Sequence, residues 1–163
     1  MDWNAVTLEL LTEGNIEETR SIQREDIGED FVDSVDDIME LTQYGLDHGC
    51  IGHTYAVRYE DRIIGVIILG EAIPWETDPE ETQGLPFYRL MGFVLDRRYR
   101  GGGIGTYVLD ETVRRVYQEF GVRPIMLGCH RDNVDGERFW LRHGFRKTDA
   151  MEGNDCYYLR YPS

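Results

Sequence analysis

Arg100-Gly101-Gly102-Gly103-Ile104-Gly105-Thr106 is the most informative stretch of this 163-residue chain. It follows a β-prone run and opens a long amphipathic segment, so its four glycines lie at the start of a predicted helix. The start of a helix presents unpaired backbone N–H groups and the positive end of the helix dipole. Glycine lets the backbone approach a ligand closely, and an arginine adds charged donors. The stretch therefore predicts a site for a phosphate or diphosphate group, to which Thr106 can contribute a hydroxyl.

Other glycine-rich phosphate loops match this stretch less well. A P-loop would carry Lys followed by Ser or Thr after its last glycine, whereas Gly105 is followed by Thr106 and Tyr107. A dinucleotide fingerprint needs a third glycine at the position that Thr106 occupies. A tight turn that needs glycine only for its backbone angles would account for one or two of the four glycines. A nucleotide-phosphate binder of an unrelated fold stays an alternative.

The segments on either side of the glycines predict a strand and a helix. Arg89–Leu95 is β-prone, and Ile104–Phe120 carries apolar residues at helical spacing up to Gly121, where a helix would stop. Strands that alternate with helices indicate an α/β fold, in which a mixed central sheet is covered by helices on both faces. Further strands are predicted at Val6–Leu11, Thr54–Tyr59, Ile63–Leu69, Ile125–Cys129 and Tyr157–Tyr161, and further helices at Ile16–Gln23, Val35–Tyr44 and Asp135–His143.

Two connections carry expectations of their own. Glu60-Asp61-Arg62 is a polar turn that joins two strands into a hairpin, and the unbroken apolar run Ile63–Leu69 predicts a second strand buried on both faces. Pro74–Pro86 is rich in proline and acidic residues, so we expect a mobile loop there. With 41% hydrophobic residues and no internal repeat, residues 1–163 are expected to form a single domain.

The charge balance of the chain is strongly acidic. It has 31 Asp and Glu residues against 17 Lys and Arg residues, and a net charge of -14. Such a surface repels phosphate backbones and anionic lipids, so neither nucleic acid nor a membrane is an expected partner. Cys50, Cys129 and Cys156 are odd in number and far apart, which argues against a disulfide framework. Without a signal-like N-terminus or an apolar run of about 20 residues, the sequence predicts a soluble cytoplasmic protein.

Two motifs in sequence resemble the GNAT superfamily of N-acetyltransferases. The first is Arg-x-x-Gly-x-Gly before a long helix, with Arg100, Gly103 and Gly105 at the defined positions. The second is an asparagine before a short helix that ends in Gly-Phe. Its residues are Asn133, Phe139, Trp140, Gly144 and Phe145. Together the motifs cover roughly Arg89 to Arg146. The resemblance implies a GNAT-like fold and an enzyme that uses acetyl-CoA.

The resemblance also implies roles for particular residues. The backbone of Phe93, Val94 and Leu95 would pair with the pantetheine arm as an added strand would. Asn133 would bond the pantetheine or cap the helix that follows it. The acetyl group would pass directly to a primary amine of a small molecule or a peptide, and a homodimer stays open. The implied cofactor-binding residues are Phe93, Val94, Leu95, Arg100, Gly101, Gly102, Gly103, Ile104, Gly105, Thr106, Asn133, Phe139 and Trp140.

The catalytic residues are not identified by the sequence. In many family members a tyrosine protonates the leaving thiolate, but the matching position here is Trp140, whose indole N–H donates a hydrogen bond and no proton. Tyr157 or Tyr158 could substitute, the thiolate could leave unassisted, or the chain could be a non-catalytic acyl-CoA-binding or sensing module. The candidate carboxylates near the acceptor entrance, each of which could equally be solvated, are Glu71, Glu76, Asp78, Glu80 and Glu81.

Two further clusters are read as structural. His48, Cys50 and His53 have the residue types of a zinc site, but no fourth ligand lies nearby in the sequence, so no metal is predicted. Cys129 and His130 are neighbours on a predicted strand and would point to opposite faces, which excludes a nucleophile and base pair. Cys129 is expected to be a core residue.

Overall fold

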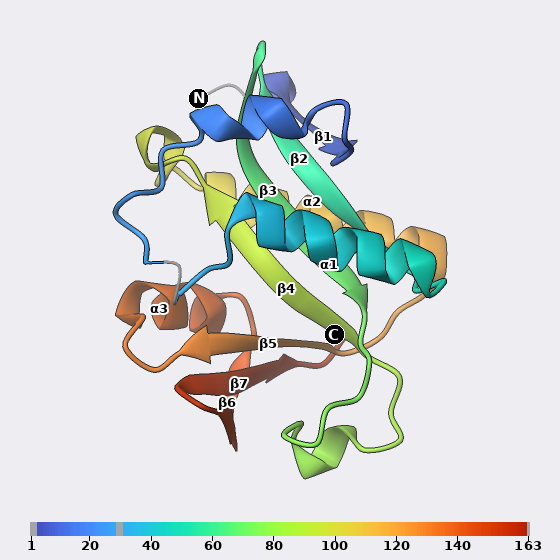
Figure 1. Ribbon diagram of the computed structural model, residues 1–163. Helices are drawn as coiled ribbons and strands as arrows, with labels where there is room; N and C mark the ends of the chain where they lie inside the picture. Colours follow the sequence, from blue (N-terminus) through green and yellow to red (C-terminus); the bar gives the residue numbers. More distant parts are fainter. Residues whose placement is uncertain (1–2, 29–30, 163) are drawn as a thin grey trace.

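A mixed sheet of seven strands forms the centre of the computed structural model, which describes residues 3–28 and 31–162. The strands run in the spatial order β1-β2-β3-β4-β5-β7-β6, and every neighbouring pair is antiparallel except β4 and β5 (Figure 1). Their bounds are β1 (Val6–Leu10), β2 (Gly52–Tyr59), β3 (Arg62–Glu71), β4 (Tyr88–Leu95), β5 (Ile125–His130), β6 (Arg146–Glu152) and β7 (Asp155–Arg160).

Helices cover both faces of the sheet, as the sequence predicts (Figure 1). α1 (Val35–Asp47) lies on one face, α2 (Ile104–Phe120) lies on the other, and α3 (Val134–Arg142) follows β5. The 3-10 helix η1 (Trp3–Ala5) precedes β1, and the 3-10 helices η2 (Ile16–Ser21), η3 (Glu80–Thr82) and η4 (Arg97–Tyr99) lie in the connections. None of the helices in the described part of the chain is long and apolar enough to cross a membrane.

Two of the apolar clusters among the described residues cover the two faces of β3, and a third, smaller one contains Phe87, Met126, Tyr157 and Leu159. On the α1 face, Ile38 packs with Val66 and Ile68, and on the α2 face Val108 and Val116 pack against alternate residues of the same strands. Eight consecutive residues of β3 are buried, which confirms the expectation that this strand has no solvent-exposed face. Burying apolar side chains on both sides of the sheet stabilises the fold by removing them from water.

The sheet opens between its two parallel strands. β4 and β5 pair only at Tyr88 with Ile125 and at Arg89 with Met126, and their later residues have no register partners in each other. β4 also carries a bulge, because the register against β3 shifts and leaves Met91 without a partner. Figure 1 shows the two strands diverging from this shared end. The result is a V-shaped opening between β4 and β5.

Three segments differ from the sequence-based expectation. β6 was missed because it is a mostly polar edge strand with a register shift, so it lacks a clear period of two. The predicted helix Ile16–Gln23 is the 3-10 helix η2. Pro74–Pro86, expected as a mobile loop, contains η3 and the buried residues Asp78 and Thr82. The proline and acidic composition of the segment gave no indication that Asp78 and Thr82 are buried.

Candidate active site

A cleft of about 520 Å³ occupies the V between β4 and β5. Eleven of the thirteen predicted cofactor-binding residues line it: Phe93, Leu95, Arg100, Gly101, Gly103, Ile104, Gly105, Thr106, Asn133, Phe139 and Trp140. Gly102 belongs to the same turn but does not line the cleft. The side chain of Val94 is 1% exposed and packs in the core on the α1 face, because neighbouring residues of a strand point to opposite faces. The geometry therefore brings the two predicted motifs together.

The glycine stretch forms an open turn in front of α2. Gly101, Gly102 and Gly103 have φ angles of 85°, 61° and 88°, a region that residues with a β-carbon rarely adopt. A β-carbon on Gly101 or Gly102 would meet no atom within 4 Å, so only the backbone angle demands glycine there. The N–H groups of residues 102, 103, 105 and 106 have no acceptor among the described residues. Four unpaired donors at a helix start form a site for an anion.

Arg100 lies at this site but is already paired. Its Nε donates to the carbonyl oxygen of Leu95 at 2.9 Å, and its Nη2 donates to Oδ1 of Asp26 at 3.2 Å. This hydrogen bond holds the pKa of Asp26 below its usual value. The two contacts fix the guanidinium at the mouth of the cleft. An anionic ligand must compete with Asp26 for it.

A histidine that the sequence analysis missed links the two motifs. His143 Nδ1 lies 2.6 Å from the carbonyl oxygen of Phe139, and Nε2 lies 2.7 Å from the hydroxyl of Thr106. A carbonyl oxygen only accepts, so Nδ1 donates a hydrogen to Phe139. The contact ties the start of α2 to the end of α3. Its position directly before Gly144, at a predicted helix end, is the one signal the sequence offered.

Asn133 caps α3, and aromatic side chains fill the space between the motifs. Oδ1 of Asn133 accepts from the N–H of Gly136 at 3.0 Å, so the capping role is observed and a bond to pantetheine stays a prediction. Phe93 lies 6.1 Å from Phe139 and 6.3 Å from Trp140, measured between ring centroids. These rings form an apolar wall on one side of the cleft.

The two tyrosines considered as substitutes for Trp140 lie elsewhere. The hydroxyl of Tyr158 donates to Glu137, and burial raises its pKa. The hydroxyl of Tyr157 donates to Glu152 at 2.8 Å, and burial raises its pKa to about 12. Neither residue lines the cleft, and among the described residues no tyrosine does. A phenol is therefore absent from the part of the cleft wall that the structure describes.

The carboxylates named from the sequence do not line the cleft either. Asp78 accepts from Arg89 through both of its oxygens, at 3.0 Å each, and Glu71 accepts from Arg123 at 3.1 Å. Glu81 pairs with Arg146. Glu76 and Glu80 are solvent-exposed. None of these five carboxylates lines the cleft.

Four aspartates line the cleft instead, namely Asp26, Asp33, Asp135 and Asp155. Burial raises the pKa of Asp33, and the neighbouring charges of Asp37 and Asp155 raise it further. Burial also raises the pKa of Asp155, while the charge of His130 opposes this. Asp33 precedes α1 and Asp155 opens β7, so the fold joins residues far apart in the sequence. No local motif marks them.

His48 and His53, two members of the cluster that has the residue types of a zinc site, have partners in the protein. His48 Nδ1 bonds the carbonyl of Tyr44 at 2.7 Å, His53 Nε2 lies 2.7 Å from a carboxylate oxygen of Glu119, and the described residues contain no group of three that could hold a metal. Cys129 is buried as expected and also lines the cleft. Burial raises its pKa to about 11, so it is a thiol at neutral pH.

Fold and cleft together define a class of protein. A mixed sheet that splays at its only parallel pair, with a helix start of unpaired amides beside the opening, suits a ligand that carries both a diphosphate and a strand-like arm. This is the geometry of an acyl-CoA-dependent acyltransferase. Residues 16–145 match the acetyltransferase (GNAT) family, so the chain belongs to that family and is an N-acetyltransferase with acetyl-CoA as its acetyl donor.

Individual relatives agree with the family. The chain is 25% identical over 119 residues to the spermine/spermidine N(1)-acetyltransferase of Bacillus subtilis (strain 168), which covers 71% of this chain and 76% of that protein. The PaiA N-acetyltransferase of Thermoplasma acidophilum, solved with coenzyme A, has a TM-score of 0.66 at 16% identity over 99% of this chain and 100% of that one. A GNAT acetyltransferase of Elizabethkingia anophelis, solved with acetyl-CoA, has a TM-score of 0.62 at 15% identity over 98% and 99%.

Proposed function

We propose that this enzyme binds acetyl-CoA in the V between β4 and β5 and acetylates an amine that enters from the α1 face. The observation that carries the proposal is the row of unpaired N–H groups at the start of α2, directly beside the opening of the sheet. Acetyl-CoA supplies its acetyl group as an activated thioester. The cleft residues have to bind it, orient it and exclude water.

The residues present fit acetyl-CoA. The backbone amides of the glycine stretch and the guanidinium of Arg100 would hold the diphosphate. Where β4 turns away from β5, the backbone of Phe93 and the N–H of Leu95 have no register partner in β5 and could pair with an extended arm, while the carbonyl oxygen of Leu95 accepts from Arg100. Phe139 and Trp140 would cover that arm with apolar surface. These roles are the ones that the resemblance to the family implies.

The acceptor amine would be received by Asp33 and Asp155. A primary amine is a cation at neutral pH and must lose a proton before it attacks. Carboxylates with raised pKa values attract the ammonium and are better proton acceptors than ordinary ones, directly or through a water molecule. The substrate of the Bacillus subtilis relative, a polyamine by its name, is such a cation. A cationic small molecule or a peptide amine is therefore the proposed acceptor class.

The remaining proposals concern the domain organisation of the enzyme, its cellular compartment and its partners. The whole chain is proposed to act as one domain, because a single sheet connects its first described strand with its last. The three cysteines are free, which suits the reducing cytoplasm. The net charge of -14 disfavours nucleic acid and anionic membranes as partners.

The proposal is tested by thiol release from acetyl-CoA with a panel of amines. We expect release that depends on the amine, and Asp33→Asn and Asp155→Asn variants with a KM for the amine raised about tenfold each, because each loses a carboxylate that faces the ammonium. Asp110→Asn, on the exposed side of α2, is the matched control and should behave as wild type. Tight binding of acetyl-CoA without amine-dependent thiol release would instead identify a non-catalytic acyl-CoA-binding module.

A further inference from the structure

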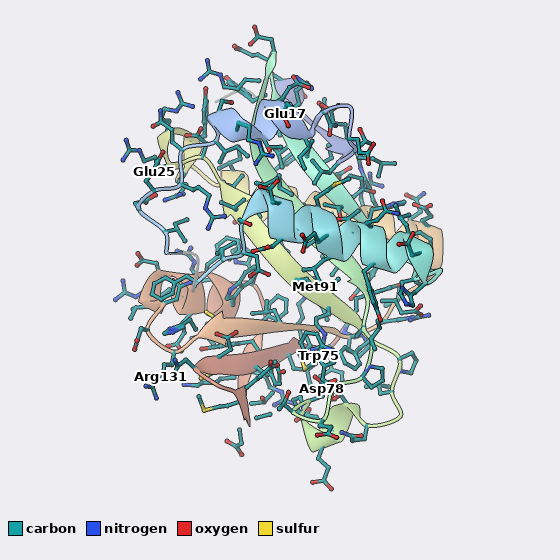
Figure 2. The ribbon with its side chains drawn as sticks, in the orientation of Figure 1. Glu17, Glu25, Trp75, Asp78, Met91 and Arg131 are labelled. Carbon is teal, nitrogen blue, oxygen red and sulfur yellow. The ribbon has the colours of Figure 1, made fainter. Side chains whose placement is uncertain are left out.

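A second cavity, of about 410 Å³, lies on the α1 face of the sheet, and we call it the apolar groove. Residues of β2, β3 and β4 form its floor, and the second half of α1 and the segment after β3 form its walls. Met91, the bulge residue of β4, lines both the apolar groove and the cleft. Figure 2 shows Met91 between α1 and Trp75. The groove therefore meets the cleft on the face from which the acceptor is proposed to enter.

The charged side chains that line the apolar groove are paired with other protein groups. The buried guanidinium of Arg89 is held by both oxygens of Asp78 and by the carbonyl of Ile73. Glu71, the one carboxylate among the described residues that line the groove, pairs with Arg123 at 3.1 Å. His53 pairs with Glu119, and the hydroxyls of Thr42 and Thr54 pair with each other.

The rest of the groove surface is apolar and exposed to solvent. The described residues leave ten large apolar side chains exposed, and five of these line the apolar groove: Leu10, Tyr44, Leu46, Ile73 and Trp75. Leu46 is 69% exposed. Contiguous apolar surface of this kind marks a binding site more often than single exposed side chains do. Because the lining offers no free charge, its ligand must be apolar along the part that the groove holds.

We infer that the apolar groove binds the hydrocarbon or aromatic body of the acceptor, so that the substrate is a monoamine with an apolar tail. The inference rests on the proposed function, since the amine must reach the cleft through the junction at Met91. A polyamine would bring a second ammonium into the groove, where Glu71, the one carboxylate of the described lining, is already paired and the cation of Arg89 lies 3.8 Å from the ring centroid of Trp75. Desolvating that ammonium without a partner is costly. The preferred acceptor therefore differs from the polyamine that the name of the Bacillus subtilis relative gives.

Three amines separate these possibilities. Butylamine, octylamine and 1,8-diaminooctane all present a primary amine, octylamine adds hydrocarbon length, and the diamine adds a second charge at the same length. We expect kcat/KM for octylamine to exceed that of butylamine by on the order of a hundredfold, because each of its four additional methylenes strengthens binding about fourfold when buried. It should also exceed kcat/KM for 1,8-diaminooctane, whose second ammonium would lose its hydration without gaining a partner. Equal values for octylamine and butylamine, or a preference for the diamine, would overturn the inference while leaving the proposed function standing.

Variants of the groove wall give a second test. Leu46→Glu and Ile73→Glu place a charge on exposed positions, so the fold should tolerate them, and together they should reduce the ratio of kcat/KM for octylamine over butylamine toward one. Val122→Glu, 63% exposed and outside the groove, is the matched control and should keep the ratio. An unchanged ratio in the double variant would contradict the inference.

The oligomeric state shows whether a second copy of the chain, rather than the substrate, covers the apolar groove. Size-exclusion chromatography with light scattering should give the same mass for wild type and for the Leu46→Glu, Ile73→Glu double variant. A wild-type dimer that the double variant turns into a monomer would show that the groove is a subunit interface and would overturn the inference. Thiol release with other amines of the panel but with none of these three would overturn the inference, whereas no amine-dependent release with the whole panel would remove the proposed function.

Discussion

The cleft and the apolar groove lie side by side on one sheet, but they differ in whether their polar groups have partners within the protein. At the glycine stretch, four backbone N–H groups have no acceptor in the described part of the chain, and Arg100 is held by the carbonyl oxygen of Leu95 and by the exposed carboxylate of Asp26. In the groove, Arg89 and Glu71 are paired within the protein. A site for a charged ligand has hydrogen-bond donors without a protein partner, whereas in a site for an apolar ligand the charged side chains are paired within the protein. The ligand class can thus be inferred from which polar groups lack a partner.

The largest loss of stability is expected from breaking the buried ion pair of Asp78 and Arg89 at the wall of the apolar groove. Asp78→Ala leaves the guanidinium of Arg89, 4% exposed, without its carboxylate, and breaking a buried pair from one side costs about 3–5 kcal/mol. We expect a loss of this size in the free energy of unfolding, measured with urea. The double variant Asp78→Leu, Arg89→Met should recover most of it. If Asp78→Ala costs under about 1 kcal/mol, the groove is not closed by this pair and the comparison fails.

The open site is probed by Arg100 and its competitor Asp26. Arg100→Ala should raise the Kd for coenzyme A roughly tenfold to a hundredfold, since a charged donor to the diphosphate is lost. Asp26→Asn should have the opposite sign and lower the Kd by a few-fold, because the guanidinium is then released from a charged partner. Isothermal titration calorimetry measures both. An unchanged affinity in Arg100→Ala would contradict the placement of the diphosphate.

A pH titration of stability tests how strongly Asp96 holds the segment between β4 and the glycine stretch. Asp96, directly after β4, is fully buried. Burial alone would raise its pKa, but hydrogen bonds from the side chain of Arg98 and from the N–H groups of Gln23 and Arg98 lower it to about 2. A lowered pKa stabilises the fold above the unfolded pKa near 4, and this stability is lost as the pH falls through 2. We expect a loss of about 2 kcal/mol over that range, measured by denaturant unfolding.

The Asp96→Asn variant is the control for the titration. It cannot ionise, so it should be less stable than wild type at pH 7 and should lack this part of the pH dependence. A wild-type slope in the variant would assign the effect to other carboxylates.

The sequence predicted the open site far better than the groove, for a physical reason. The glycine stretch, its arginine and the helix behind it are neighbours in the chain, so local spacing is enough to locate them. Asp33 and Asp155 come together only through the fold, as do Met91 and Trp75. Residues that meet by tertiary packing leave no periodic signal. Their assignment therefore required the structure.

The same distinction explains the errors. The acidic residues after β3 were interpreted as one group, yet Asp78 is buried on Arg89 while Glu76 and Glu80 face solvent. Composition gives the charge of a segment and not the partner of each side chain. β6 was missed because an edge strand covered on one side needs few apolar residues. Both errors concern long-range contacts.

The smallest effect concerns Trp140, where cleft and chemistry meet. Its ring lies 4.9 Å from that of Phe139 and 5.5 Å from that of Phe145, measured between centroids, so a smaller aromatic ring should keep the wall of the cleft. We expect Trp140→Tyr to leave the Kd for coenzyme A within about threefold and to raise kcat a few-fold, because a phenol can protonate the leaving thiolate and an indole cannot. Trp140→Phe, which has the ring without the hydroxyl, is the matched control and should show no gain. Equal kcat in the two variants would mean that the thiolate leaves without an acid at this position, and a large loss of affinity in both would show that the indole itself packs on the cofactor.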